Sequence, residues 1–364
     1  MITTIRVLIV DDAVMVRSRL SKILSADPEI EVAGVAATGQ IALAKVAQLK
    51  PDVVILDVEM PDLDGLQILS RIRQNNLHLP VIMFSAMTTR GATATLDALT
   101  LGASDYVTKP NHLENGSNPA QYLQDTLIPK IKALSQKTIQ KTASLRSDAA
   151  SATVFSDPPS NPTLTTVAMV AIGVSTGGPN ALATLLAEVP PDFPVPILIV
   201  QHMPPMFTRL LAERLTTKCA LPVREAIGGA PVCPGTIWIA PGDYHLTVKP
   251  TGSTVQFAVE QTLPRNSCRP SVDVLFESVA QVYGEQTLGI ILTGMGQDGL
   301  QGCRQIRDRH GQILAQDEAT SVVWGMPRFV AEAGLADAVL PLDQIMPEIL
   351  RRVSCTAAGR GGKA

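Results

Sequence analysis

The sequence predicts an α/β protein of two domains, each a mostly parallel sheet with helices on both faces. Three observations lead to this prediction. The chain has 364 residues, more than one hydrophobic core usually serves. Short β-branched apolar runs alternate with helical patterns along most of it, as in strands buried on both faces of a parallel sheet. Residues 134–165, rich in Ser, Thr, Ala, Lys and Pro, interrupt this alternation and predict a helix end followed by a flexible linker.

The first part of the chain predicts a doubly wound domain at residues 1–125. Its predicted strands occupy residues 5–10, 53–56, 80–84 and the stretch that includes 104–107. The first helical pattern places four apolar side chains on one face: Val16, Leu20, Ile23 and Leu24. About five β/α units therefore fit into this part.

A second α/β domain is expected at residues 166–353, after a helix end and linker at 126–165. Its strand-like runs are residues 167–172, 195–200, 236–240, 254–260 and 288–293. One helical stripe consists of Val272, Leu275, Phe276, Val279, Ala280 and Tyr283. Residues 354–364 are expected to be disordered.

Composition limits the class of partner. With 30 Lys+Arg against 33 Asp+Glu, the net charge is −3, which disfavours nucleic acid as a partner. No apolar run approaches the roughly 20 residues that cross a bilayer, and the early apolar run is too short for a signal peptide. We expect a soluble, cytoplasmic protein without membrane insertion. The five cysteines form no CxxC pair and are expected to be buried thiols.

Polar residues follow the predicted strands of the first domain. Asp11 and Asp12 follow the first strand, Asp57 the third, Ser85 the fourth and Lys109 the fifth. The carboxyl ends of parallel strands share one edge, so these residues should meet there. Crowded carboxylates repel unless a cation neutralises them, and oxygen ligands suit Mg2+. Mg2+ and a lysine are also what Asp57 would need to attack a phosphoryl group.

With "DVEMPDLDG" after the central strand and "DYVTKP" at the fifth, residues 4–125 closely resemble the receiver domain of two-component response regulators. The resemblance implies that Asp57 is the phosphoacceptor. It also implies that Asp11, Asp12 and the backbone carbonyl of Glu59 help to hold Mg2+. Ser85 and Lys109 would contact the phosphoryl group, and Tyr106 would report the switch.

Two motifs compete in the second domain. "GVSTG", residues 173–177, fits the G-x-S-x-G pattern, in which a tight turn exposes a serine, here Ser175, and Pro179 suits the first turn of the next helix. "GMGQDG", residues 294–299, fits G-x-G-x-x-G and would make the domain a dinucleotide sensor, with Asp317 and Glu318 as the later acids. Against that alternative, the carboxylate of Asp298 would repel a pyrophosphate.

Histidine favours the first motif. Of five histidines, His202 follows directly from a buried strand, in "ILIVQHMPPM", and should reach the same sheet edge as Ser175 and Asp298. His310 is expected near a helix C-terminus, and the other three, His78, His112 and His245, on the surface or in loops. A serine, a histidine and an aspartate at three strand ends suit a catalytic triad. The order Ser, His, Asp differs from that of α/β-hydrolases.

Both halves together resemble the CheB-type chemotaxis protein-glutamate methylesterases over nearly the whole chain. The segments that carry the resemblance are the receiver motifs, "IGVSTGGPNAL", "IVQHMPPMFT", "IAPGDYHL", "CRPSVDVLFESVA" and "ILTGMGQDGLQG". The resemblance implies hydrolysis of γ-glutamyl methyl esters on chemoreceptor helices, with release of methanol, and commonly glutamine deamidation. The implied catalytic residues are Ser175, His202 and Asp298, with Thr176 nearby and the Met295 backbone helping the oxyanion.

The resemblance also describes the regulation. In that family the unphosphorylated receiver packs over the catalytic opening, and phosphorylation by the chemotaxis histidine kinase relieves the block. The esterase half is expected to need no cofactor. Arg269 could steer acidic receptor helices, although a solvated surface arginine is the expected role.

Overall fold

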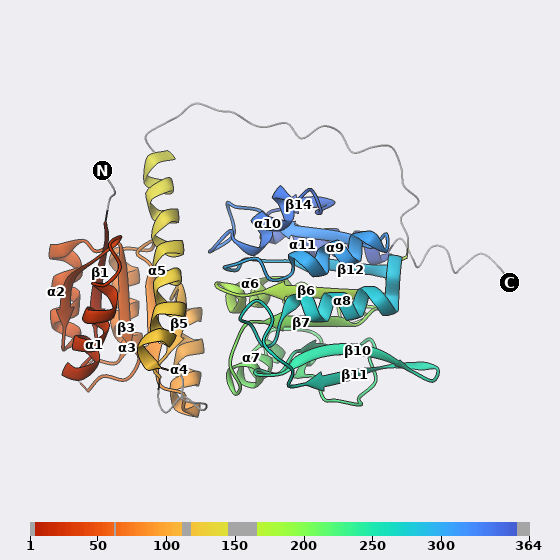
Figure 1. Cartoon of the computed structure of the whole chain (residues 1–364), viewed down its shortest axis with the longest axis horizontal. Helices are drawn as coiled ribbons and strands as arrows, with labels where there is room; N and C mark the ends of the chain where they lie inside the picture. The colour runs from red at the N-terminus through yellow and green to blue at the C-terminus, as the bar shows by residue number, and fades with distance from the viewer. Residues whose placement is uncertain (1–3, 62, 111–117, 145–165, 355–364) are drawn as a thin grey trace. The chain divides into compact units, whose positions relative to one another are not determined.

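The computed structural model describes residues 4–61, 63–110, 118–144 and 166–354, and the chain divides into two compact units (Figure 1). The first contains elements β1 to α5, and the second contains β6 to α11. Each unit carries its own sheet, as the sequence predicts.

The first unit is a five-stranded, all-parallel sheet in the order β2-β1-β3-β4-β5. Its strands are β1 (Ile5–Val10), β2 (Ile30–Ala36), β3 (Val53–Asp57), β4 (Val81–Ser85) and β5 (Asp105–Thr108). Its helices are α1 (Val14–Leu24), α2 (Gly39–Leu49), α3 (Gly65–Asn75), α4 (Thr89–Thr100) and α5 (Pro119–Ser144). The predicted doubly wound fold is confirmed.

Burial explains which of these elements the sequence revealed. Every residue of β3, β4 and β5 is buried, and these strands read as continuous apolar runs. The edge strand β2, which was not predicted, is half exposed and has no such run. α1 contacts α5, whereas α2 contacts α3 and α3 contacts α4, so that two helical layers cover the sheet.

One predicted domain limit falls inside a helix and not between two elements. The limit at residue 125 falls inside α5, where Leu123, Leu127, Ile131 and Leu134 form a buried stripe. Of the helix end and linker expected at 126–165, residues up to Ser144 belong to α5, and 145–165 lie outside the described residues. Of the tail expected at 354–364, Ser354 ends α11, and 355–364 lie outside the described residues. Among the described residues, no helix combines the length and the apolar character needed to cross a membrane.

The second unit contains a seven-stranded parallel sheet in the order β14-β13-β12-β6-β7-β9-β8. Its strands are β6 (Met169–Val174), β7 (Ile197–Gln201), β8 (Val223–Glu225), β9 (Ile237–Ile239), β12 (Thr287–Ile291), β13 (Gln312–Gln316) and β14 (Ala338–Leu340). Its helices are α6 (Gly178–Leu186), α7 (Phe207–Thr216), α8 (Val272–Tyr283), α9 (Leu300–Asp308), α10 (Met326–Glu332) and α11 (Leu342–Ser354), with a short 3-10 turn at Gly284–Gln286.

Two helical layers enclose this sheet. α8 contacts α9 and α9 contacts α10, whereas α6 contacts α7 and α11. The start of α8 lies directly on β6, because a Cβ added at Gly173 would come within 2.4 Å of Cγ1 of Val272. A side chain at Gly173 would therefore push the first turn of α8 off the sheet.

The unit also contains an antiparallel hairpin, β10 (His245–Thr251) and β11 (Thr254–Glu260), which forms a separate two-stranded sheet. The predicted strand at 254–260 exists, but it pairs with β10 in this hairpin and bridges to Pro231, and it does not join the parallel sheet. β10 contacts α8, and Leu246, Val248 and Phe257 are buried in the core. The hairpin extends the core on the α8 side of the sheet.

Candidate functional site

The edge of the first sheet gathers the charged residues predicted there. Nζ of Lys109 lies 2.9 Å from Oδ2 of Asp11 and 2.8 Å from Oδ2 of Asp57. Asp11 and Asp57 are buried, whereas Asp12 is exposed. Burial raises the pKa of Asp57 to about 6, and its hydrogen bond with Lys109 opposes the rise. The pocket therefore holds more negative charge than one lysine can neutralise.

The donor set fits a hard divalent cation. Carboxylate oxygens of Asp11, Asp12 and Asp57 all lie within 4.8 Å of one another. Oxygen ligands with one solvent-exposed member suit Mg2+, which keeps several waters when it binds. Asp12 and Glu59 also line a surface pocket beside the cluster, which gives access to it.

The other predicted receiver residues lie on or near the same edge. Ser85 ends β4 opposite Thr108 of β5, and its buried hydroxyl donates to the carbonyl of Ala86 at 3.3 Å. The backbone N–H of Glu59 donates to Oδ1 of Asp57 at 3.2 Å. Tyr106 is buried in β5, and this burial raises the pKa of its phenol well above the usual value.

The second sheet brings Ser175 and His202 side by side. Val174 of β6 pairs with Gln201 of β7, and the N–H of His202 donates to the carbonyl of Val174 at 3.1 Å. Ser175 and His202 are the next residues along neighbouring strands, which lie about 4.8 Å apart. On the other side, the N–H of Ser175 donates to the carbonyl of Thr293, just beyond β12, at 3.0 Å. Ser175 therefore lies between His202 and the loop that carries Asp298.

The G-x-S-x-G segment forms the predicted tight turn from strand to helix. Gly177 has a φ of 78°, in the left-handed region that favours glycine. A Cβ at Gly178 would come within 2.0 Å of Oε1 of Gln201, so the turn needs glycine there as well. Pro179 lies in the first turn of α6. Ser175 is partly exposed, whereas the residues on both sides of it are buried.

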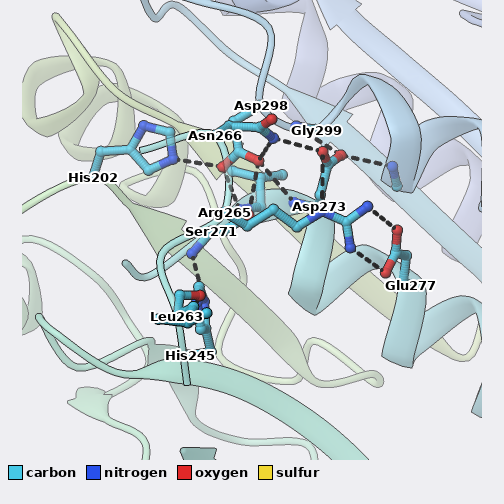
Figure 2. A network of polar contacts seen from close by, with 12 residues as sticks. His202, His245, Leu263, Arg265, Asn266, Ser271, Asp273, Glu277, Asp298 and Gly299 are labelled. Carbon is cyan, nitrogen blue, oxygen red and sulfur yellow. Dashed lines mark hydrogen bonds and ion pairs between the residues drawn. The ribbon is translucent and has the colours of Figure 1, made fainter. Parts of the chain in front are cut away.

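Asp298 is a buried carboxylate with four strong donors (Figure 2). Its Oδ2 lies 2.8 Å from Nε2 of His202 and accepts from the N–H of Val272 at 2.6 Å. Its Oδ1 accepts from the hydroxyl of Ser271 and the amide of Asn266, both at 2.8 Å. Burial alone would raise the pKa of Asp298, but the hydrogen bond with His202 and these other donors lower it to about 2. Asp298 is thus held as a carboxylate against the N-terminus of α8.

A second buried carboxylate fixes the loop around Asp298. Oδ1 of Asp273 accepts from the N–H groups of Gly299 and Gly302, at 3.0 and 2.7 Å. The amide of Asn266 donates to Oδ2 of Asp273 at 2.8 Å as well as to Asp298, and so bridges the two acids (Figure 2).

The same contacts overturn the dinucleotide alternative. A pyrophosphate in a G-x-G-x-x-G motif needs the free N–H groups at the start of the following helix. Here the carboxylate of Asp273 occupies the N–H groups of Gly299 and Gly302 around the start of α9. Asp298, the other acid of the motif region, faces His202 instead.

The two nitrogens of the His202 ring have different neighbours. Because the Asp298 carboxylate can only accept, Nε2 carries the proton between them, and in the neutral ring Nδ1 is therefore the acceptor. Nδ1 lies 3.7 Å from Sγ of Cys268. Burial favours the neutral ring, but Cys268 and Asp298 outweigh it and raise the pKa of His202. Within the described residues, the ring bonds with Asp298 and Cys268, and the predicted bond with the Ser175 hydroxyl is not formed.

Ser175 also packs against the loop that contains Met295. A Cβ at Gly294 would come within 2.9 Å of Cβ of Ser175. Met295 is partly exposed, and the next residue, Gly296, is exposed with a φ of 88°. Thr176 is buried, and its carbonyl accepts from the hydroxyl of Thr293 at 2.9 Å.

Several predictions for individual residues are wrong. His245 is buried at the start of β10, where Nδ1 accepts from the N–H of Ser271 at 3.3 Å. Arg269 is not a solvated arginine, because it pairs with Asp243 at 2.5 Å and donates to a backbone carbonyl. Cys233 is exposed.

The sequence analysis missed Cys268, as it missed Asn266, Ser271 and Asp273 around Asp298. Cys268 is partly exposed rather than buried, and it lies next to His202. Its position in "CRPSVDVLFESVA", immediately before a helix that starts at the same sheet edge, is the signal that would have found it.

Comparisons with known proteins show which family the chain resembles. Residues 170–349 match the family model for the CheB methylesterase, and residues 7–118 match that for the response regulator receiver domain. A protein-glutamate methylesterase/protein-glutamine glutaminase of Trichodesmium erythraeum is 54% identical, over 96% of this chain and 99% of its own. One of the same name from a Nocardioides species is 50% identical, over 96% of both chains.

A solved structure also matches the second unit. The crystal structure of the Thermotoga maritima CheB methylesterase catalytic domain superposes with a TM-score of 0.50 and 42% identity, over 51% of this chain and 98% of that one. From these relatives and the two family matches, we conclude that the chain belongs to the CheB methylesterase family, with a receiver domain and a methylesterase domain in one polypeptide.

Proposed function

We propose that this protein is a phosphorylation-activated serine hydrolase of chemotaxis adaptation. It removes methyl groups from γ-glutamyl methyl esters on methyl-accepting chemoreceptors, releases methanol, and deamidates particular receptor glutamines. The observation that carries the proposal is the 2.8 Å contact that fixes the His202 ring on Asp298, beside the strand-to-helix turn of Ser175.

In the first step, Ser175 attacks the ester carbonyl while Nδ1 of His202 accepts its hydroxyl proton. Asp298 holds the ring through Nε2 and stabilises the imidazolium that forms. Bonds of this kind commonly shorten only when substrate is bound, so the resting contact of Nδ1 with Cys268 is compatible with this step. The imidazolium then gives the proton to the departing methoxide, which leaves as methanol. The acyl group stays on Ser175 as an acyl-enzyme.

In the second step, His202 takes a proton from water, whose oxygen attacks the acyl carbonyl. The bond to Oγ of Ser175 breaks, His202 returns the proton to that oxygen, and the glutamate product leaves. Deamidation follows the same route with ammonia as the leaving group. The N–H of Met295 is suited to bind the oxyanion, since its loop packs against Ser175 at Gly294, and Thr176 supports the turn. None of these steps needs a cofactor.

The receiver domain, which we assign to residues 1–125, is the regulatory input. Asp57 accepts a phosphoryl group from the chemotaxis histidine kinase, and Asp11, Asp12, Asp57 and the carbonyl of Glu59 would hold Mg2+. When bound, Mg2+ neutralises charge on the phosphoryl oxygens. Lys109 and Ser85 contact the phosphoryl group, and Tyr106 responds to the switch. Phosphorylation relieves inhibition of the catalytic domain, residues 166–353, by the receiver. The enzyme acts in the cytoplasm on the receptors' signalling helices.

The experiment that tests the catalytic assignment is release of methanol from methyl-labelled receptor membranes. Ser175→Ala is expected to reduce release by about 10³-fold or more, because it removes the nucleophile. Ser253→Ala, at the exposed tip of the β10–β11 hairpin, is the matched control and should keep the full rate. Release from Ser175→Ala at the control rate would rule out the assignment.

The regulatory assignment has its own test. A small acyl phosphate with Mg2+ should stimulate methanol release by the full chain, and Asp57→Asn should remove the stimulation while the basal rate remains. Equal stimulation of the variant would place the phosphoacceptor elsewhere.

A further inference from the structure

Cys268 is the nucleophilic group at the catalytic centre that the mechanism does not use. Its Sγ lies 3.7 Å from Nδ1 of His202, and the opposite ring nitrogen lies 2.8 Å from Asp298. One donor atom from each of Cys268, His202 and Asp298 lies within 4.8 Å of the other two. Thiolate, imidazole and carboxylate are the three kinds of side chain that bind zinc in proteins.

The thiol is held in this position by a constrained turn. The backbones of Arg265 and Cys268 exchange two hydrogen bonds, at 3.0 and 2.8 Å. Arg265 forms two 2.7 Å bonds with Glu277 of α8, and Asn266 is anchored on Asp298 and Asp273. Since both sides of the turn are fixed to α8 and to the Asp298 loop, Sγ of Cys268 is presented to the ring.

The spacing of the two donor atoms suits a tetrahedral metal ion. With Zn–S of about 2.3 Å, Zn–N of about 2.05 Å and an angle of about 109°, nitrogen and sulfur lie about 3.6 Å apart. The separation of 3.7 Å between Nδ1 and Sγ agrees with this value. Asp298 on Nε2 stands where zinc sites commonly have a carboxylate that orients the ligating histidine. His202 and Cys268 are both partly exposed, so an ion can enter and keep water on its remaining positions.

We propose that Nδ1 of His202 and Sγ of Cys268 form an inhibitory site for a thiophilic divalent metal ion, Zn2+, at the catalytic centre. The inhibition rests on the proposed function, because the ion occupies the nitrogen that accepts the proton of Ser175. On binding, the thiol releases its proton to solvent and the sulfur becomes a thiolate ligand. Mg2+ prefers oxygen ligands and does not compete here, so the protein has an oxygen site in the receiver and a nitrogen and sulfur site in the esterase domain.

The first measurement is methanol release by the full chain, with Mg2+ in excess and Zn2+ set by a metal buffer. Zn2+ is expected to inhibit the unsubstituted enzyme. Cys268→Ala and Cys268→Ser, each compared with its own zinc-free rate, should raise the half-inhibitory concentration by at least about tenfold. Cys233→Ala removes an exposed thiol far along the chain from Cys268 and should leave the inhibition unchanged. Equal zinc sensitivity of the Cys268 variants and the unsubstituted enzyme would overturn the proposal.

The second measurement does not depend on activity. Co2+ added to the full chain should produce a thiolate-to-cobalt charge-transfer band that disappears in Cys268→Ala and persists in Cys233→Ala. Co2+ in the receiver pocket has oxygen ligands and gives no such band. A band that persists in Cys268→Ala, or that is absent from the unsubstituted protein, refutes the site even if the enzyme is active. An enzyme without methylesterase activity that still shows the Cys268-dependent band would instead refute the proposed function.

Discussion

The two sheets each place a buried aspartate at the carboxyl ends of their strands, and the two acids have opposite electrostatics. Asp57 is 2% exposed and burial raises its pKa to about 6, whereas Asp298 is 3% exposed and its pKa is lowered to about 2. Asp57 has one strong side-chain partner, Lys109, and two other acids nearby. Asp298 has an imidazole, a hydroxyl, an amide and a backbone N–H.

Because both acids are almost fully buried, the difference between their pKa values reflects the number of donors around each carboxylate, which at Asp298 outweighs the effect of burial. At the receiver edge, Asp11 and Asp57 share the single cation Lys109 and lie beside a third acid, Asp12, which suits a site that takes up a metal ion and a phosphoryl group. The esterase edge satisfies every oxygen of Asp298 internally, which suits a proton relay that must be in place before substrate arrives.

Removing the charge of Asp298 at the esterase edge should have the largest effect on catalysis. Asp298→Asn is expected to lower kcat for methanol release by about 10⁴-fold, because an amide nitrogen facing Nε2 reverses the tautomer and takes Nδ1 away as an acceptor. Steady-state kinetics on methyl-labelled receptor would measure this. Asp308→Asn, at the exposed end of α9, should keep the normal rate. A loss of less than tenfold in Asp298→Asn would remove Asp298 from the relay.

Removing one hydrogen-bond donor to Asp298, the amide of Asn266, should have a smaller effect on kcat. Asn266→Ala is expected to lower kcat by roughly tenfold to a hundredfold with little change in KM, because two buried carboxylates lose the amide between them. Asn266 has a φ of 52°, so Asn266→Gly is the control for backbone conformation and should lose as much activity as Asn266→Ala. Full activity of the glycine variant would show that the residue serves only the turn.

At the receiver edge, the expected effect is on the stability of the native protein. Mg2+ at ten times its dissociation constant should stabilise the native protein by about 1.4 kcal/mol and raise the Tm by a few degrees. Asp57→Asn should weaken this response, because one of three carboxylates no longer attracts the ion. Asp125→Asn, an exposed acid in α5, should not. Thermal melts with and without a chelator give the comparison, and an undiminished Mg2+ shift in Asp57→Asn would argue against this ligand set.

The smallest effect concerns the pH dependence of catalysis. The reaction needs the neutral form of His202. Because the pKa of this ring is raised, the neutral form appears only at higher pH, and kcat/KM should therefore rise with pH above the ordinary histidine pKa of about 6.5. Cys268→Ala removes one cause of the raised pKa and should move this acidic limb to lower pH. The profile should be recorded in chelator, to exclude metal, with Cys233→Ala as the unshifted control. A limb that stays in place or moves to higher pH in Cys268→Ala would contradict the role given to the thiol.

The sequence revealed the fold and the polar residues at strand ends because both follow local rules. Buried parallel strands read as apolar runs, and Asp57, Ser175 and His202 each follow such a run directly. These signals depend on neighbours within a few residues. The half-exposed strand β2 and the hairpin position of β11 gave no comparable pattern.

What the sequence could not show arises between segments distant along the chain. Nothing near Asn266 in the sequence indicates that its amide bridges Asp273 and Asp298. Asn266 and Asp298 are 32 residues apart. His245 belongs to a strand that lacks an apolar run at its start, yet its ring braces the N-terminus of α8. The contact of Cys268 with His202 spans 66 residues and depends on the left-handed turn at Asn266 and Ser267.

Gly173 limits how this enzyme can be engineered. Replacing glycine by alanine in a regular strand is a common way to gain thermostability, since it restricts the unfolded chain. At Gly173 the added methyl group would collide with Val272, the same residue whose N–H binds Asp298. An exchange that stabilises other positions of the sheet would here displace Val272 and weaken its hydrogen bond to Asp298. The absence of a side chain at Gly173 in β6 therefore helps to keep Asp298, more than a hundred residues later, in its catalytic position.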